Sequence, residues 1–432
     1  MTAAALGLAL CAPLAGNTAT AGAGESEIEQ LKAQVAALLQ RVEQLERGQA
    51  AAPSAAAATP QVETRLAAVE ETNDRQSDQL AQGLASLSAM DWARNIKWKG
   101  DLRYRHEQFD VEGVSSDRVR HRLRARFGLE AKVTPTLSVG LQVASSEGRD
   151  SRSSNASLDS ASQHKEIGLD LAYVDWKPRE NLLVTLGKQK QPWFKAGNSL
   201  FFDGDVNPEG AALQYGGKTG LFAKAWGFWL EEMGASADSN VIGAQFGYAF
   251  GNGVTVAAGY WDYGAMQDQP VLAFAGSPAG NSSYLAGADC LGAGVVRCYT
   301  HDYNIAVVDA QWTGSMGSLP VTLFGGYLEN LDPGTLNTGH NLGFQLGKAA
   351  DAGSWEFGLM YQDVERDAQV AAFIDSDFAD GLTQGRGYVL QGAWAPVKNT
   401  TLKATYFINE RNYDTPTEAD YERLQLDLNY KF

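Results

Sequence analysis

Arginine recurs at every second position in one segment of this 432-residue chain, within the run RVRHRLRARF. The residues are Arg118, Arg120, Arg122, Arg124 and Arg126. In an extended strand, side chains two residues apart share a face, so the five guanidinium groups form a ladder. Arginine stays charged at any working pH and binds carboxylate or phosphate through paired hydrogen bonds. The arginine ladder therefore predicts a surface that attracts small anions.

Other charged residues could extend or oppose the arginine ladder. The additional cations occupy alternate positions in two other segments, and these are Arg103, Arg105, Lys188 and Lys190. Two carboxylates, Asp203 and Asp205, follow in a polar stretch. An acidic stretch facing a basic wall would create a strong transverse field. The alternative interpretation is that the arginines pair with loop carboxylates and select nothing.

Catalytic chemistry has little support in the sequence. His301 precedes Asp302 and His106 precedes Glu107, but neighbours on a strand point to opposite faces. There is no GxSxG motif, phosphate-binding loop or cluster with metal-ligand spacing. We therefore expect no enzyme activity, no metal and no cofactor. The net charge of -16 argues against nucleic acid as a partner, since such proteins need a basic footprint.

The arginine ladder belongs to a segment in which charged and apolar residues alternate. Val119, Leu123, Ala125 and Phe127 occupy the opposite face. With a mean hydropathy of -0.26, the chain has no apolar run suited to a membrane helix beyond a weak stretch at its start. In a transmembrane β-barrel, however, one face of each strand meets lipid and the other lines the lumen, which gives this alternation.

About sixteen such segments follow one another to the end of the chain. They lie near 96–108, 118–133, 137–148, 165–178, 182–190, 209–217, 219–231, 239–250, 253–264, 301–314, 319–331, 337–349, 353–367, 383–396, 399–411 and 421–432. Very short connections alternate with long ones, such as 191–208 and 265–300. This is typical of bacterial barrels, whose turns face the periplasm and whose loops face outward. We predict an all-β fold, a 16-stranded antiparallel transmembrane β-barrel over residues 96–432.

The N-terminal quarter predicts export and helices. Residues 1–24 form a short apolar core followed by an A-x-A-like site, which indicates a signal peptide whose basic start is missing. Residues 25–48 carry apolar residues at heptad spacing, which predicts an α-helical coiled coil that favours a parallel dimer. A Pro/Ala-rich hinge at 49–60 and a second, more polar periplasmic helix at 61–92 complete this region; a solvated spacer helix is the alternative for 61–92.

Export also bears on the cysteines. Disulfides form in oxidising compartments, and Cys290 and Cys298 lie close together in a Gly/Ala-rich stretch. We predict a local disulfide between them, with two free thiols as the alternative.

Several of these features together resemble the trimeric general and substrate-specific porins of Gram-negative bacteria. The runs IKWKGDLRYRHEQFD at 96–110, RVRHRLRARFGLEAKV at 118–133, IGLDLAYVDWKP at 167–178 and LGKQKQPW at 186–193 resemble the "putative porin" family more narrowly. The chain ends on the aromatic Phe432, as outer-membrane barrels do. The plan of coiled coil plus barrel is also similar to the dicarboxylate-type porins and the phosphate-selective porins O and P.

The resemblance implies a homotrimer in the outer membrane, in contact with lipid and lipopolysaccharide, with the coiled coil in the periplasm. It also implies that the third long loop, 191–208, folds inward and brings Asp203 and Asp205 opposite the arginine ladder. We therefore expect passive diffusion of small hydrophilic solutes, with a preference for small anions such as carboxylates or phosphate. The alternative is a structural protein that tethers the envelope through its periplasmic coiled coil.

Overall fold

The computed structural model describes residues 35–44, 60–89, 95–148, 150–232, 238–264, 266–272, 277–286 and 296–432. The chain divides into two units, Met1–Ser88 and Ala89–Phe432. The first unit holds a helix over residues 35–44 and nearly all of α2 (Pro60–Ala89). The predicted signal peptide, and the predicted hinge up to residue 59, lie outside the described residues.

Only part of the predicted heptad pattern falls on described residues. Val35, Leu38 and Val42 lie in the helix over 35–44, and all three are exposed. The other apolar positions of the pattern lie outside the described residues, so the coiled coil stays a prediction. Among the described residues, no helix combines the length and apolar character needed to span a bilayer.

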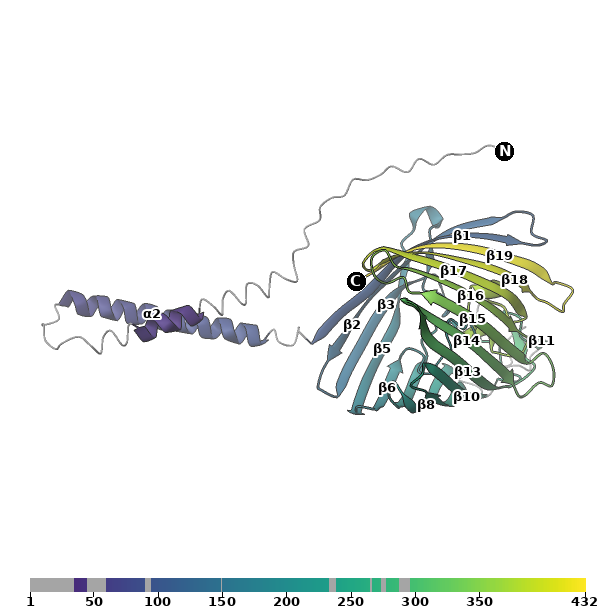
Figure 1. The fold of residues 1–432 in the computed structure, drawn as a ribbon, viewed down its shortest axis with the longest axis horizontal. Helices are drawn as coiled ribbons and strands as arrows, with labels where there is room; N and C mark the ends of the chain where they lie inside the picture. The colour runs from purple at the N-terminus through teal and green to yellow at the C-terminus, as the bar shows by residue number, and fades with distance from the viewer. Residues whose placement is uncertain are drawn as a thin grey trace, which may run out of the picture. The chain divides into compact units, whose positions relative to one another are not determined.

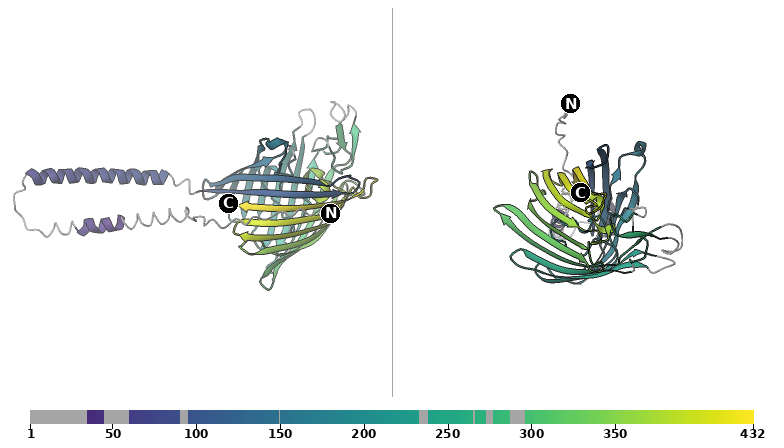
Figure 2. Two further views of the ribbon diagram at one scale, coloured as in Figure 1. Left: turned by 90° about the horizontal axis from the view of Figure 1, so that it is seen from above. Right: turned by 90° about the vertical axis from the view of Figure 1, so that its right-hand side faces the viewer.

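The second unit is a closed antiparallel β-barrel (Figures 1 and 2). Its sixteen long strands are β1 (Ile96–Val111), β2 (Arg118–Lys132), β3 (Leu137–Ser146), β5 (Glu166–Arg179), β6 (Leu182–Lys188), β7 (Glu209–Tyr215), β8 (Gly220–Glu231), β9 (Ser239–Ala249), β10 (Val254–Gly264), β13 (Tyr303–Met316), β14 (Leu319–Asn330), β15 (Thr338–Gly347), β16 (Trp355–Val364), β17 (Gly385–Val397), β18 (Thr400–Arg411) and β19 (Ala419–Lys431). Each pairs with the next in this order, and β19 pairs with β1. The predicted 16-stranded barrel is confirmed.

The remaining short elements lie in the loops. β4 (Ala156–Ser157) and η1 (Ser160–Ser162) belong to the 147–165 loop, and β4 pairs with β2. β11 (Ser283–Ala286) and β12 (Val296–Tyr299) form a two-stranded sheet of their own. η3 (Ala371–Phe373) and η4 (Phe378–Gly381) belong to the 365–384 loop. The sequence predicted these stretches only as loops.

Alternation along each strand decides which side chains face outward. On β2, Phe127 is 50% exposed, whereas Arg124, on the opposite face, is 8% exposed. On β19, Leu426, Leu428 and Tyr430 are likewise exposed. Because side chains alternate with a period of two, a register shift of one residue would move all the apolar side chains of a strand from the lipid side to the lumen. The outward face therefore agrees with the sequence pattern.

The barrel closes where β19 meets β1, the yellow and blue strands of Figure 2. The Gly100 N–H donates to the Phe432 carbonyl at 3.0 Å, and the Phe432 N–H donates to the Gly100 carbonyl at 3.1 Å. A β-carbon at position 100 would collide with the ring of Phe432. Glycine at this position therefore leaves room for the ring of Phe432 beside β1.

Candidate functional site

The arginine ladder runs along the inner face of β2 beside the charged face of β1. The register pairs Arg105 with Arg122 and Arg103 with Arg124. Arg105, Arg122 and Arg124 are all buried. Cations so close together repel one another, and burying them is costly unless carboxylates compensate. The location of those carboxylates decides what the site can do.

Part of the compensation comes from the seam between β1 and β19. Glu107, which is 0% exposed, accepts hydrogen bonds from Arg423 at 2.5 Å and from Arg120 at 2.6 Å. Arg105 donates to both carboxylate oxygens of Asp427, at 2.6 and 2.8 Å. Glu107 lies on β1, next to the ladder strand β2, and Asp427 lies on β19, on the other side of β1. They bind Arg120 of the arginine ladder, together with Arg105 and Arg423, in a buried network of ion pairs.

A third carboxylate pairs with the half of the arginine ladder nearest the short turn between β2 and β3. Asp101 on β1 accepts hydrogen bonds from Arg124 at 2.8 Å and from Arg126 at 2.9 Å. Asp205 approaches the same two arginines from the 189–208 loop, at 3.9 Å from Arg124 and 3.4 Å from Arg126. The loop carboxylate and the wall carboxylate thus hold the two guanidinium groups between them.

The 189–208 loop reaches this position by crossing the interior of the barrel. Its residues 194–200 bond with amide side chains on five other strands, namely Gln245, Gln311, Asn341, Gln362 and Gln391. The bonds range from 2.7 Å, between Phe194 N–H and Gln245, to 3.3 Å, between Asn198 and Gln391. The loop is therefore fixed to the opposite wall by side chains that satisfy its backbone.

Asp203 has a different environment from Asp205. Its carboxylate is 4% exposed and accepts hydrogen bonds from the backbone N–H groups of Asp205 and Ser376. It makes no ion pair with an arginine of the described barrel. Burial, reinforced by the nearby carboxylates of Asp375 and Asp205, raises the pKa of Asp203 well above its usual range. Asp203 therefore joins two loops together.

The 365–384 loop adds a further carboxylate to the basic wall. Asp377 forms ion pairs with Arg423 at 2.8 Å and with Arg105 at 3.0 Å. Burial opposes its ionisation, but Arg423 and Arg105 hold the pKa of Asp377 well below its usual range. Burial and the charge of Asp377 raise the pKa of the neighbouring Asp375 to about 6. The entry of this loop into the barrel was not predicted from the sequence.

The 147–165 loop also folds onto the arginine ladder. Asn155 accepts two hydrogen bonds from Arg103 through its side chain, at 2.6 and 3.1 Å. Its carbonyl accepts one from Arg122 at 2.8 Å, and Glu147 pairs with Arg122 at 3.1 Å. Three loops therefore converge on the same few wall arginines.

Three inward cations of this region differ from the rest. Within the described part of the chain, Arg103, Lys190 and Lys403 have no carboxylate within ion-pair distance. Arg103 is held only by the neutral amide of Asn155. Burial of Lys190 beside Arg126 and Arg124 lowers its pKa, against the opposing charge of Asp170. Lys403 on β18 was not among the residues predicted from the sequence.

The other two predicted cations lie elsewhere. Lys188 donates to Glu209 at 2.7 Å and to the Asn207 carbonyl at 3.2 Å, at the loop end of β6. Arg118 is exposed at the loop end of β2, with its guanidinium carbon 5.5 Å from the ring centre of Phe109. Neither residue takes part in the ion-pair network of Glu107.

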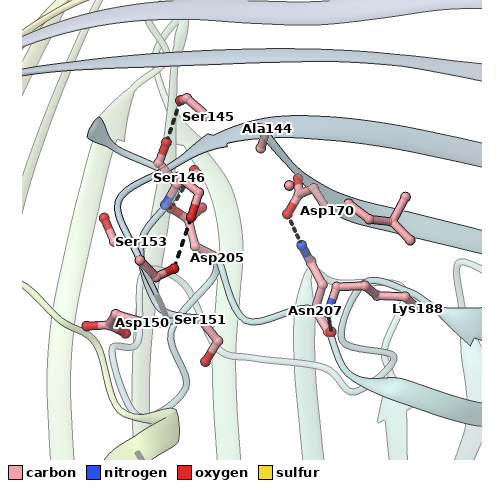
Figure 3. A pocket seen from close by; sticks show the side chains of 14 residues that line it. Ala144, Ser145, Ser146, Asp150, Ser151, Ser153, Asp170, Lys188, Asp205 and Asn207 are labelled. Atoms are coloured by element: carbon pink, nitrogen blue, oxygen red, sulfur yellow. Dashed lines mark hydrogen bonds between the residues drawn. The ribbon is translucent and has the colours of Figure 1, made fainter. Parts of the chain in front are cut away.

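A polar cavity of about 150 Å³ lies beside this network (Figure 3). Serine hydroxyls and carboxylates from β3, β5 and the two loops line it. Ser145 donates to the Ser154 carbonyl at 2.7 Å, and Asn207 donates to Asp170 at 2.6 Å, as the dashed lines mark. Lys188 lies at its rim with its amine directed to Asn207. The cavity is suited to water and small hydrophilic molecules.

The opposite half of the interior is apolar. One buried cluster contains Trp226, Trp261, Tyr303, Ile305 and Leu328 from the wall, together with Phe201 and Phe202 from the 189–208 loop. A second contains Phe324, Met360, Val389 and Phe407, with Ala196 from the same loop. The sequence pattern assigned the inward face to polar residues. Here it is apolar, because loops fill this side of the barrel and cover it.

The remaining predicted site residues are the two cysteines. Cys298 in β12 is fully buried and disulfide-bonded. Cys290 lies outside the described residues, so its pairing with Cys298 stays a prediction. The described residues contain no group of three or more His, Cys, Asp or Glu side chains that could hold a metal ion.

The chain was compared with known families and structures. The profile of the family described as "Putative porin" matches residues 109–273 and 303–432. None of the curated proteins compared with the chain matches it. The chain is similar to the high-pH structure of OprB from Pseudomonas putida, at 11% identity over 81% of this chain and 97% of that chain, with a TM-score of 0.53. It is also similar to OmpF of Salmonella typhi in complex with daunomycin, at 13% identity over 78% and 97%, with a TM-score of 0.48.

Proposed function

The chain belongs to the family described as "Putative porin", and on this premise we propose that it lets small hydrophilic solutes diffuse passively through the barrel, with a preference for small anions. The family and the barrel fold are those of outer-membrane solute channels, which are not enzymes. Small carboxylates or phosphate are the proposed solutes. Kinship with the dicarboxylate-type porins and the phosphate-selective porins O and P is part of the same proposal.

The observation that carries the proposal is the set of unpaired cations Arg103, Lys190 and Lys403. The charge of a guanidinium group is largely neutralised when it pairs with a carboxylate. An unpaired cation, in contrast, still attracts mobile anions. Arg103 lies next to the paired Arg105 and Arg124, so the three loops leave one arginine of this wall uncompensated. Inward cations of this kind favour anions in a pore.

The net charge of -16 does not oppose this proposal. Selectivity depends on the potential inside the lumen, where low-dielectric walls concentrate the field of the nearest charges. Asp205 adds to the effect by holding Arg124 and Arg126 in place while leaving Lys190 without an ion pair. The arginine ladder then acts as a rigid scaffold for the unpaired cations.

A planar-bilayer reversal potential in a salt gradient tests the proposal. We expect the triple variant Arg103→Gln, Lys190→Gln, Lys403→Gln to lose most of the anion preference of the parent. The control is Arg386→Gln, which removes a cation on the outer face that pairs with Glu410 at 2.6 Å. The difference should fade in 1 M salt, where the Debye length is about 3 Å. Coinciding potentials of parent and triple variant at low salt would refute the anion preference.

We also propose that the chain is a homotrimer whose periplasmic coiled coil joins the three copies. The exposed Val35, Leu38 and Val42 support this, because an apolar stripe on an isolated helix needs a partner. Native mass measurement of the detergent-solubilised chain distinguishes dimer from trimer. A structural tether is the alternative function, and it predicts no solute-dependent current in the bilayer experiment.

A further inference from the structure

A second cavity, of about 200 Å³, lies between the 189–208 loop and the loop ends of β8, β9 and β10. Aromatic rings form a large part of its wall, among them Trp193, Phe202, Phe228, Trp261, Tyr263 and Phe373. The cavity lies on the apolar side of the barrel. It shares none of its lining residues with the unpaired cations Arg103, Lys190 and Lys403.

The rings are arranged to receive another ring. Trp193 meets Trp261 edge to face with 5.6 Å between ring centres, and Phe202 stacks on Trp261 at 5.2 Å. Tyr263 stacks on Phe373 at 5.8 Å. Aromatic pairs prefer these offset and edge-to-face geometries. A dry apolar cavity of about 150 Å³ is large enough to bind benzene, so this one has room for a single substituted ring.

The rim of the cavity carries one ion pair. Lys188 donates to Glu209 and to the Asn207 carbonyl, which uses two of the three N–H groups of its ammonium. The Glu209 side chain is 63% exposed, so its carboxylate has room for a further donor. A hydroxyl group placed here can accept a hydrogen bond from Lys188 and donate one to Glu209. A carboxylate placed here would meet the negative charge of Glu209.

The wall also holds polar atoms that the protein does not satisfy. In the described chain, Trp193 Nε1, Gln191 Oε1 and Asn207 Oδ1 are buried and have no hydrogen-bond partner. All three residues line this cavity. Orphaned buried polar atoms are uncommon in folded proteins and call for an explanation. Two of the three atoms are acceptors, which again favours a ligand that donates a hydrogen bond.

From the ring cluster, the bridging ion pair and the orphaned acceptors, we propose that this cavity binds a neutral single-ring phenol. The ring packs among Trp193, Phe202 and Trp261. The hydroxyl accepts a hydrogen bond from Lys188 and donates its single hydrogen either to Glu209 or to one of the two orphaned acceptors. Phenols are neutral at pH 7, since the phenolic pKa is about 10. The site therefore goes beyond the proposed anion preference, because it takes an uncharged ligand and relies on different residues.

Calorimetric titration of the full chain in detergent micelles tests this site. The probes are phenol, benzoate and cyclohexanol, which has a hydroxyl but no aromatic face. We expect saturable binding of phenol, with cyclohexanol and benzoate each about tenfold weaker because they lack the ring contacts or meet Glu209. The variant Val241→Phe fills the cavity from a buried wall position and should abolish phenol binding. Its reversal potential should equal that of the parent.

Glu209→Gln sharpens the assignment. It removes the charge that excludes carboxylates while keeping the shape, so benzoate should gain about tenfold relative to phenol. Equal heats for the parent and Val241→Phe would mean that phenol only partitions into the micelle, and would overturn the site. Tighter binding of benzoate than of phenol by the parent would overturn the phenol assignment. Either result leaves the anion preference of the channel untouched, because the reversal potential measures that separately.

Discussion

The interior of the barrel has two halves that use the same loops in opposite ways. On the β19–β1–β2 side, the loops contribute Asp205, Asp377 and Asn155, which bind wall arginines. On the β8–β16 side, the 189–208 loop contributes Phe201 and Phe202, which pack with wall residues such as Trp261. The 189–208 loop thus pairs with wall arginines near its end and fills the interior of the barrel with aromatic side chains along its middle.

The comparison shows that different residues narrow the lumen of the barrel and set its charge. The apolar half is a packed core, in which rings exclude water and narrow the space left for solutes. The basic half is a network of ion pairs in which one missing carboxylate leaves Arg103 available to solutes. We expect variants in the two halves to differ in which property they change.

The largest effect should come from Glu107→Gln in the basic half. This change removes the buried carboxylate that Arg423 and Arg120 share, and breaking a buried pair costs about 3–5 kcal/mol of unfolding free energy. Denaturant unfolding of the reconstituted barrel measures the loss. The control Glu410→Gln breaks a pair with Arg386 whose two side chains are each 38% exposed, and should cost less than about 1 kcal/mol. Equal losses would mean that burial of the Glu107 network is unimportant.

Trp261→Ala should be nearly as costly in the apolar half. Trp261 is 1% exposed, and removing a buried aromatic side chain costs about 3 kcal/mol or more. The reversal potential should stay that of the parent, because no charge is removed. Trp312→Ala, at an outward position that is 36% exposed, is the matched control and should lose less. A changed ion preference in Trp261→Ala would show that the two halves are coupled.

Gly197→Ala tests the attachment of the 189–208 loop. Gly197 has a φ of +50°, and an added β-carbon would collide with the ring of Phe324. We expect a cost of about 1–3 kcal/mol and a larger conductance as the loop tip moves from the wall. Adding Phe324→Ala should recover part of the loss. Gly217→Ala, which has open space around it, should change neither property, and a conductance equal to the parent in Gly197→Ala would contradict the loop assignment.

The smallest effect should be the pH dependence of the contact between two loops. Because the pKa of Asp375 is raised to about 6, the folded protein keeps a proton that the unfolded chain releases near pH 4. The stability that this protonated carboxyl group contributes is fully present below about pH 4 and is lost as the pH rises through about 6. Asp375→Asn stays neutral and still accepts from Asp377 and Phe378. The unfolding free energy of this variant, measured by denaturant unfolding, should equal that of the parent at pH 4 and exceed it at pH 8 by on the order of 1 kcal/mol. A variant less stable than the parent at pH 8 would exclude burial as the cause of the raised pKa.

Much of the barrel could be predicted from the sequence, because strand alternation is a local property. The charged face of 118–126 and the apolar face around Phe127 follow directly from the order of residues. The inward course of the 191–208 loop could be expected from the resemblance to porins. The contact of Asp205 with Arg126 is consistent with that expectation.

The pairing of charges could not be predicted, because it depends on residues far apart in the chain. Glu107 and Arg423 meet only when β19 closes on β1. Asp377 reaches Arg105 only because the loop between β16 and β17 folds into the barrel. Likewise, nothing in the sequence distinguishes Trp226, which faces inward, from a tryptophan that faces outward. Only the covering loops make its face apolar.

The seam between β1 and β19 has a consequence for folding kinetics. Its ion pairs join residues 322 and 316 positions apart, Arg105 with Asp427 and Arg423 with Glu107. Contacts of such separation form late, since the chain must first lose the entropy of closing a very long loop. Interactions that form after the transition state do little to speed folding but slow unfolding. The seam that is last to close is therefore the one that sets how long the closed barrel survives.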